Sequence, residues 1–243
     1  MVLQLQDIDP ETDFPAIARC EFEAHEDPPQ RFFHAFFPIL GAGDAAARED
    51  AIAECAARLK LWHAHDPTSN WKKVVDTETG KIAAASLWNI YRENPFAGPP
   101  APLEVDWFPD DGSRAFAQQF IPAHSAPRAR VGQRPHVYLF MLFTHPDYRR
   151  RGAGQMCMDW GKEQADALGL EMFLESTPYG RPLYEKNGFV LIEEYVNQPQ
   201  TDNPDEAWKA IEEKVGPVIF RLMWRPAGQD YEEGKTIKPW EEK

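Results

Sequence analysis

Residues 143–155 read FTHPDYRRRGAGQ and join an apolar stretch of strand length, Val137–Thr144, to a segment with helical periodicity. Glycine at positions 152 and 154 lets a ligand approach the backbone closely. The helix N-terminus that follows presents N–H groups and about half a positive charge. The stretch therefore predicts an anion-binding turn, to which the arginines at 149, 150 and 151 add charge. A purely structural turn is the alternative that these residues alone leave open.

The charge of the whole chain makes this stretch an exception. Lysine and arginine number 26 against 39 aspartate and glutamate, a formal net charge of −13 that repels nucleic acid and anionic membranes. From Arg128 to Arg151, however, there are six arginines and one acid, Asp147, which indicates a specific anion site. A Rossmann site fits poorly because position 157 is cysteine where the fingerprint has a third glycine or alanine. A P-loop is excluded because no Gly-Lys-Ser/Thr follows.

Length and composition are typical of a globular protein, with 43% apolar and 27% charged residues in a chain of 243. The longest apolar run, Val137–Phe143, is far shorter than the roughly 18 residues of a membrane helix, and the acidic N-terminus lacks the features of a secretory signal. We therefore expect a cytoplasmic location, with the nucleus as the alternative. We expect no metal site, because the cysteines are scattered without CxxC spacing and His63 and His65 lack a third ligand.

Hydrophobic periodicity and turn signals predict alternating strands and helices. The expected strands are residues 3–6, 71–76, 81–88, 137–144, 171–176, 189–196 and 218–224, and the expected helices begin near residues 13, 44, 152, 183 and 203. Residues 93–135 hold eight of the 22 prolines, which predicts an insertion with a helix only near Ser113–Ile121. We expect one mixed α/β domain over residues 1–225, with a central sheet of about seven strands and flanking helices, and a polar tail over residues 226–243.

Two motifs in this order resemble the GNAT superfamily of acyl-CoA-dependent N-acetyltransferases. The family signature is Arg/Gln-x-x-Gly-x-Gly/Ala after a strand that ends in Leu-x-Val-x-Pro, and Leu142–Pro146 followed by Arg149–Gly154 is similar to it. The segment Leu183–Phe189 (LYEKNGF) resembles the Leu-Tyr-x-x-x-Gly-Phe that closes the core of the family. The resemblance covers residues 136–192, and residues 175–180 (ESTPYG) look like fungal members of unassigned substrate.

The resemblance implies a GNAT fold whose sheet splays at the coenzyme site, with acetyl-CoA as cosubstrate. It places the pantetheine arm between the parted strands, on the backbone of Leu142, Phe143 and Thr144. It places the pyrophosphate on the amides of Arg149, Arg150, Arg151, Gly152, Ala153, Gly154 and Gln155. The remaining coenzyme-binding residues expected on this basis are Ser176, Thr177, Gly180 and Tyr184.

Acyl transfer to an amine needs a base and an acid. An amine with a pKa of about 10.4 must lose a proton before it attacks, and the departing thiolate must gain one. The resemblance assigns the acid to Tyr184. The base that we name is Glu175, because Phe140 and Met141 stand where many relatives carry an acidic or histidine side chain. The alternatives are His145, His136, Tyr138 and a path through water.

These features predict an enzyme that transfers an acetyl group from acetyl-CoA to a primary amine by direct attack. A small-molecule amine is favoured over a protein or peptide, because the insertion at residues 93–135 can cover the acceptor site. A non-catalytic acyl-CoA-binding or regulatory domain is the alternative, which the missing acidic residue near Phe140 supports. A scaffold without a coenzyme would leave the two motifs unexplained together.

Overall fold

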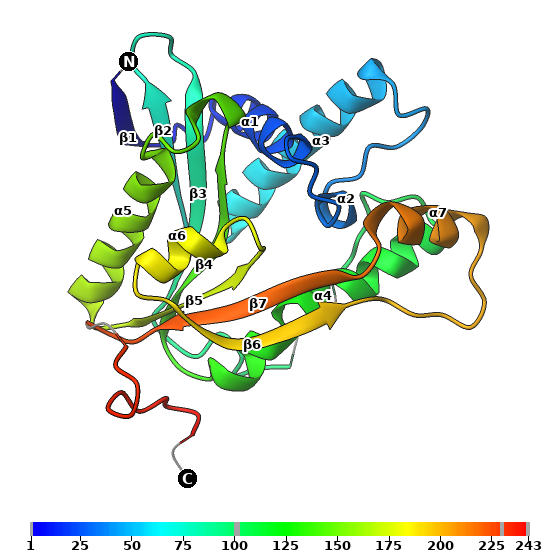
Figure 1. The fold of residues 1–243 in the computed structure, drawn as a ribbon. Coiled ribbons are helices and arrows are strands. Elements are labelled where there is room, and N and C mark those ends of the chain that lie inside the picture. Colours follow the sequence, from blue (N-terminus) through cyan, green and yellow to red (C-terminus); the bar gives the residue numbers. More distant parts are fainter. Residues whose placement is uncertain (1, 100–102, 229–230, 242–243) are drawn as a thin grey trace.

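The computed structural model describes residues 2–99, 103–228 and 231–241. Residues 100–102 of the expected insertion, and residues 229–230 and 242–243 of the expected tail, lie outside the described residues. The elements in chain order are β1 (Leu3–Asp7), α1 (Phe14–Glu26), α2 (Phe33–Phe36), α3 (Ala45–His65), β2 (Ser69–Asp76), β3 (Ile82–Tyr91), α4 (Gly112–Val131), β4 (His136–Thr144), the 3₁₀ turn η1 (Pro146–Tyr148), α5 (Ala153–Leu168), β5 (Glu171–Ser176), α6 (Arg181–Lys186), β6 (Val190–Asn197), α7 (Glu206–Val215) and β7 (Val218–Arg225) (Figure 1).

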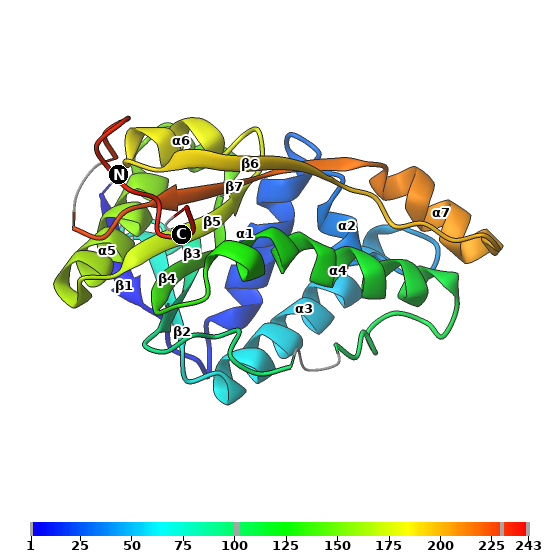
Figure 2. The ribbon, with the colours of Figure 1, turned by 90° about the horizontal axis from the view of Figure 1, so that it is seen from below.

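Within the described residues, seven strands form one mixed sheet in the order β1-β2-β3-β4-β5-β7-β6. All neighbours are antiparallel except β4 and β5, which are parallel and are connected through α5. Helix α5 packs on one face of the sheet, whereas α1, α3 and α4 lie on the other (Figures 1 and 2). This arrangement confirms the predicted fold class.

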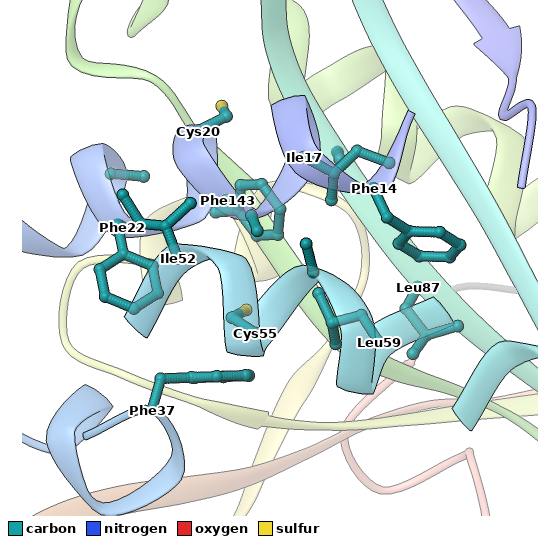
Figure 3. Close-up of a cluster of buried hydrophobic side chains, with 14 of the residues drawn as sticks. Phe14, Ile17, Cys20, Phe22, Phe37, Ile52, Cys55, Leu59, Leu87 and Phe143 are labelled. Carbon is teal, nitrogen blue, oxygen red and sulfur yellow. The ribbon is translucent and has the colours of Figure 1, made fainter. Parts of the chain in front are cut away.

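Helices α1 and α3 cover the first half of the sheet because each has one apolar side. Asp44 caps α3 by accepting a hydrogen bond from the backbone N–H of Ala47 at 2.9 Å. Figure 3 shows the side chains that meet between the two helices, which include Phe14, Ile17 and Phe22 of α1 and Ile52, Cys55 and Leu59 of α3. Phe143 of β4 joins the same cluster, so the strand of the expected coenzyme site rests on this core.

The helix in the proline-rich segment is longer than predicted. The expectation of a helix only near Ser113–Ile121 is wrong, because α4 runs through two prolines, Pro122 and Pro127. Burial of Phe116 and Phe120 against α7 and β7 compensates for the backbone hydrogen bonds that the prolines forgo. Much of the proline-rich segment is therefore a regular helix, which lies on the same face of the sheet as α1 and α3 (Figure 2).

The sheet parts where β4 meets β5. The parallel pairing runs from His136–Glu171 to Leu139–Leu174 and then stops, although both strands continue. On the other side of β4, Leu87 pairs with Met141 and Trp88 with Leu139, so Phe140 is the extra residue of a β-bulge. The splay predicted for these strands is therefore present, and it leaves backbone groups of β4 beyond Leu139 unpaired towards β5.

Among the described residues, no helix is both long enough and apolar enough to cross a membrane.

Candidate active site

A cavity of about 1320 Å³ opens where β4 and β5 part. The predicted residues that line it are Leu142, Phe143, Thr144, Arg149, Arg150, Arg151, Gly152, Ala153, Gly154, Gln155, Glu175, Thr177, Gly180 and Tyr184. Ser176 is fully buried, does not line the cavity, and donates its hydroxyl to the carbonyl of Thr177 at 2.7 Å. The structure thus brings the two sequence motifs together around one space.

The turn before α5 has the backbone shape of an anion cradle. Arg150 and Gly152 both have positive φ, 58° and 90°. A Cβ at Gly152 would meet nothing within 4 Å, so open space lies in front of this residue. Helix α5 begins directly after Gly152, and its first backbone N–H groups have no hydrogen-bond acceptor within the helix. The geometry is that of a site for a phosphate or another anion.

The three arginines of the turn differ in what holds them. Arg149 donates from Nη2 to the carbonyl oxygen of Ala24 at 2.8 Å, which ties the turn to the end of α1. Arg150 and Arg151 are exposed beside it. All three line the cavity, so they contribute positive charge in a chain that is acidic as a whole.

Direct contacts join the two motifs. The side-chain amides of Gln155 and Asn187 exchange hydrogen bonds at 2.7 and 3.0 Å. A Cβ at Gly154 would lie 3.3 Å from Leu183 and 3.4 Å from the hydroxyl of Thr144, so the helix start packs closely between β4 and α6. These contacts fix α6, and with it Tyr184, relative to the anion cradle.

Tyr184 lies at the wall of the cavity and is 8% exposed. Burial raises the pKa of its hydroxyl far above the ordinary value of 10, so the group carries its proton at neutral pH. Gly180 makes room for the ring, because a Cβ there would lie only 2.6 Å from Cε2 of Tyr184. The hydroxyl is thus a proton donor held at a defined place.

Glu175 is the first residue of β5 beyond its pairing with β4. Its side chain is 1% exposed, and Oε1 accepts a hydrogen bond from Nε of Arg128 at 3.2 Å in a buried ion pair. Arg128 lies over the ring of Tyr138, 3.6 Å from the centroid. The second oxygen, Oε2, is buried without a hydrogen-bond partner within the described chain. Because the side chain is almost fully buried, Oε2 is an acceptor that an ordered water molecule can satisfy.

The other proposed bases do not line the cavity. His145 pairs with Glu23 at 3.0 Å, and Nδ1 of His136 bonds to the carbonyl oxygen of Arg134 at 2.8 Å. Tyr138 is buried under Arg128, and its pKa is raised by burial. In the described part of the chain, no three His, Cys, Asp or Glu side chains gather as metal ligands.

The titratable residues of the cavity wall that were not expected from the sequence include Glu21, His25 and His124. Burial raises the pKa of Glu21 to about 8 and lowers that of His25 to about 4. Nδ1 of His25 bonds to the carbonyl oxygen of Glu21 at 2.7 Å, which leaves Nε2 without a proton in the neutral ring. Their i, i+4 spacing on α1 is the one sequence signal that places Glu21 and His25 on the same side of the helix.

The sequence and the structure were compared with those of known proteins. Residues 84–189 match the model of the acetyltransferase (GNAT) family. A Corynebacterium glutamicum structure, described as histone acetyltransferase HPA2 and related acetyltransferase, is 19% identical with a TM-score of 0.55 over 96% of this chain and 100% of that one. A mosquito structure, described as arylalkylamine N-acetyltransferase like 5b, is 12% identical with a TM-score of 0.59 over 92% of this chain and 99% of that one. At these identities the two structures show a shared fold. The family match covers the parted strands and the two sequence motifs, so residues 84–189 of this chain are a GNAT acetyltransferase domain.

Proposed function

We propose that the protein transfers an acetyl group from acetyl-CoA to the primary amine of a small molecule. The observation that carries this proposal is that one cavity holds an anion cradle, the unpaired edge of β4, a protonated Tyr184 and a buried carboxylate, Glu175. An acetyl donor with a phosphate-rich tail and an acceptor amine need these features in one space.

In this proposal the coenzyme lies along the parted strands. The pyrophosphate binds the amides from Arg149 to Gln155, and the pantetheine arm bonds to the backbone of Leu142, Phe143 and Thr144. Thr177 and Gly180 line the same cavity. Ser176 supports this wall from inside through its bond to Thr177.

The reaction we propose is direct attack. Glu175 takes a proton from the ammonium group, and the amine nitrogen then forms a bond to the thioester carbon. The carbonyl electron pair moves to oxygen, where a backbone N–H of Leu142 or Phe143 stabilises the oxyanion. The C–S bond breaks as the carbonyl re-forms, and Tyr184 donates its proton to the departing sulfur. The nitrogen, which still carries one extra proton after the attack, gives it up through water to the Tyr184 oxygen, so the neutral amide forms and the hydroxyl is restored.

A small acceptor fits the way the cavity is enclosed. Helix α2, the C-terminal end of α1 and His124 of α4 all contribute to its wall, so the segment that includes α4 borders the acceptor side. The likeness to an arylalkylamine acetyltransferase agrees with this proposal, whereas the likeness to a histone acetyltransferase would suit a protein acceptor.

Replacement of Tyr184 by phenylalanine tests the proposal. The variant keeps the ring and removes the proton donor, so we expect kcat to fall by about a hundredfold or more while acetyl-CoA still binds. Release of free thiol from acetyl-CoA in the presence of an amine measures kcat, and calorimetry measures binding. An unchanged kcat would refute the role of Tyr184.

A further inference from the structure

Four aromatic rings form a closed circle in the wall of the cavity: Phe32, Phe36, His124 and Phe220, here called the aromatic wall. The ring centroids are 6.3 Å apart for Phe32–Phe36 and 5.6 Å for Phe36–His124. They are 4.4 Å apart for His124–Phe220 and 5.5 Å for Phe220–Phe32, which closes the circle. The rings come from α2 and the residue before it, from α4, and from β7, so three distant segments build one surface.

The aromatic wall is open to the cavity. Phe32, Phe36 and His124 are only half-buried, although each packs against other rings. A ligand that covers partly exposed apolar rings removes their surface from water, which lowers the free energy of the bound state. The aromatic wall can therefore bind an apolar group of a ligand.

Hydrogen bonds hold the aromatic wall in place. The carbonyl oxygen of Phe36 accepts from Nε1 of Trp107 at 3.1 Å and from Nη2 of Arg58 at 3.0 Å. The carbonyl oxygen of His124 accepts from the hydroxyl of Tyr195 at 2.6 Å. Because the backbone is fixed at both positions, a ligand meets a surface that is already formed, which reduces the entropy lost on binding.

A carboxylate lies beside the aromatic wall. Glu175 pairs with Leu222 across β5 and β7, two residues along the strand from Phe220. Its unpartnered Oε2 is buried, and a water molecule that donates to it can accept an N–H of an ammonium group in the cavity. Burial lowers the pKa of His124, so this ring is neutral at pH 7 and does not repel a cation. Arg128, the ion-pair partner of Glu175, is buried and does not line the cavity. The basic residues that do line it in the described chain belong to the anion-binding turn and α6: Arg149, Arg150, Arg151 and Lys186.

We propose that the acceptor is an arylalkylamine, a primary amine on a short chain that carries a flat apolar ring, with the ring against the aromatic wall and the ammonium group directed to Glu175. This inference rests on the proposed acetyl transfer and names its substrate class. A polyamine has no flat apolar ring to cover the wall, and a peptide N-terminus would bring polar amide groups that the wall cannot satisfy.

The test compares three acceptors with the purified protein and acetyl-CoA: 2-phenylethylamine, putrescine and a tripeptide with a free N-terminus. We expect kcat/KM for 2-phenylethylamine to exceed both others by about tenfold to a hundredfold. Putrescine or the tripeptide as the better acceptor would overturn the inference and leave acetyl transfer standing. Acetylation of none of them by protein that binds acetyl-CoA would overturn both the inference and the proposed activity.

Variants of the aromatic wall give the second readout. Phe36→Leu keeps an apolar side chain and removes the ring, and Phe32→Leu repeats the change beside it. We expect each to lower kcat/KM for 2-phenylethylamine by about tenfold while that for methylamine, which is too small to reach the wall, stays the same. Phe108→Leu, in the same buried cluster but outside the cavity wall, is the matched control. Equal losses with both amines in the wall variants, or the same selective loss in the control, would overturn the assignment.

Discussion

Gly180 is the position where a single methyl group tests the placement of Tyr184. Its φ of −80° is one that alanine adopts freely, so Gly180→Ala brings no backbone strain. The new Cβ would lie 2.6 Å from Cε2 of Tyr184, and ordinary contact begins at 3.4 Å. The ring must therefore move by about 0.8 Å, which is the difference between these two distances.

A shift of this size matters for proton transfer. Displacement of a catalytic group by about 1 Å can cost about a hundredfold in rate. We therefore expect Gly180→Ala to lower kcat by about that factor, as measured by thiol release from acetyl-CoA, and to change the melting temperature little. The coenzyme should still bind, because the anion cradle is built by other residues.

The matched control for this prediction is Gly98→Ala. Gly98 has no positive φ, and a Cβ there meets nothing within 4 Å, so we expect wild-type kcat. If Gly180→Ala retained kcat within about twofold of wild type, Tyr184 would not be the positioned acid and the reasoning would fail.

Three further predictions concern binding and stability. Gly152→Glu puts a negative charge into the anion cradle at φ +90°, so calorimetry should detect no acetyl-CoA binding, and tight binding would be incompatible with the assigned phosphate site. Glu21→Gln should change the pH dependence of urea unfolding. Because burial raises the native pKa of Glu21 from 4.5 to about 8, the native state holds an extra proton between these values and wild-type stability falls as pH rises through them. Between pH 4.5 and about 8, the free energy of unfolding of the variant should therefore rise relative to that of wild type by up to about 5 kcal/mol. A difference between the two proteins that does not change with pH would contradict the effect of burial on Glu21. Arg128→Met leaves Glu175 buried without its ion-pair partner and should cost about 3–5 kcal/mol in unfolding free energy, most of which Glu175→Gln should restore. A double variant no more stable than the single one would show that the pair is not the cause.

The sequence alone predicts the elements around the site well, since their signals are local. A continuous apolar run predicts β4. Two glycines, and the change from strand to helix periodicity, predict the turn before α5. The segment LYEKNGF predicts α6 and its end. The seven strands and their order along the chain follow from the same kind of pattern. The turn itself was predictable because its backbone shape depends mainly on the local residues 149–155.

Only part of the acceptor side was predictable. The aromatic cluster Phe32–Phe37 can be interpreted from the sequence as core or as the wall of a substrate pocket, but the rings that complete the wall come from distant residues. The wall forms only when α2, α4 and β7 pack together and bring Phe36, His124 and Phe220 into contact. The spacing of these residues along the chain does not predict the contact. The pairing of Glu175 with Arg128 spans 47 residues and two elements. Helix α4 is longer than predicted because the free energy gained by burying its apolar face exceeds the cost of the two prolines inside it.

Calorimetric titration of the purified wild-type protein with acetyl-CoA tests the central claim most directly. We expect saturable binding of one molecule per chain, with CoA competing for the same site. Absence of binding by well-folded protein would contradict the account, because the cradle, the parted strands and Tyr184 would then surround a cavity that the coenzyme does not use.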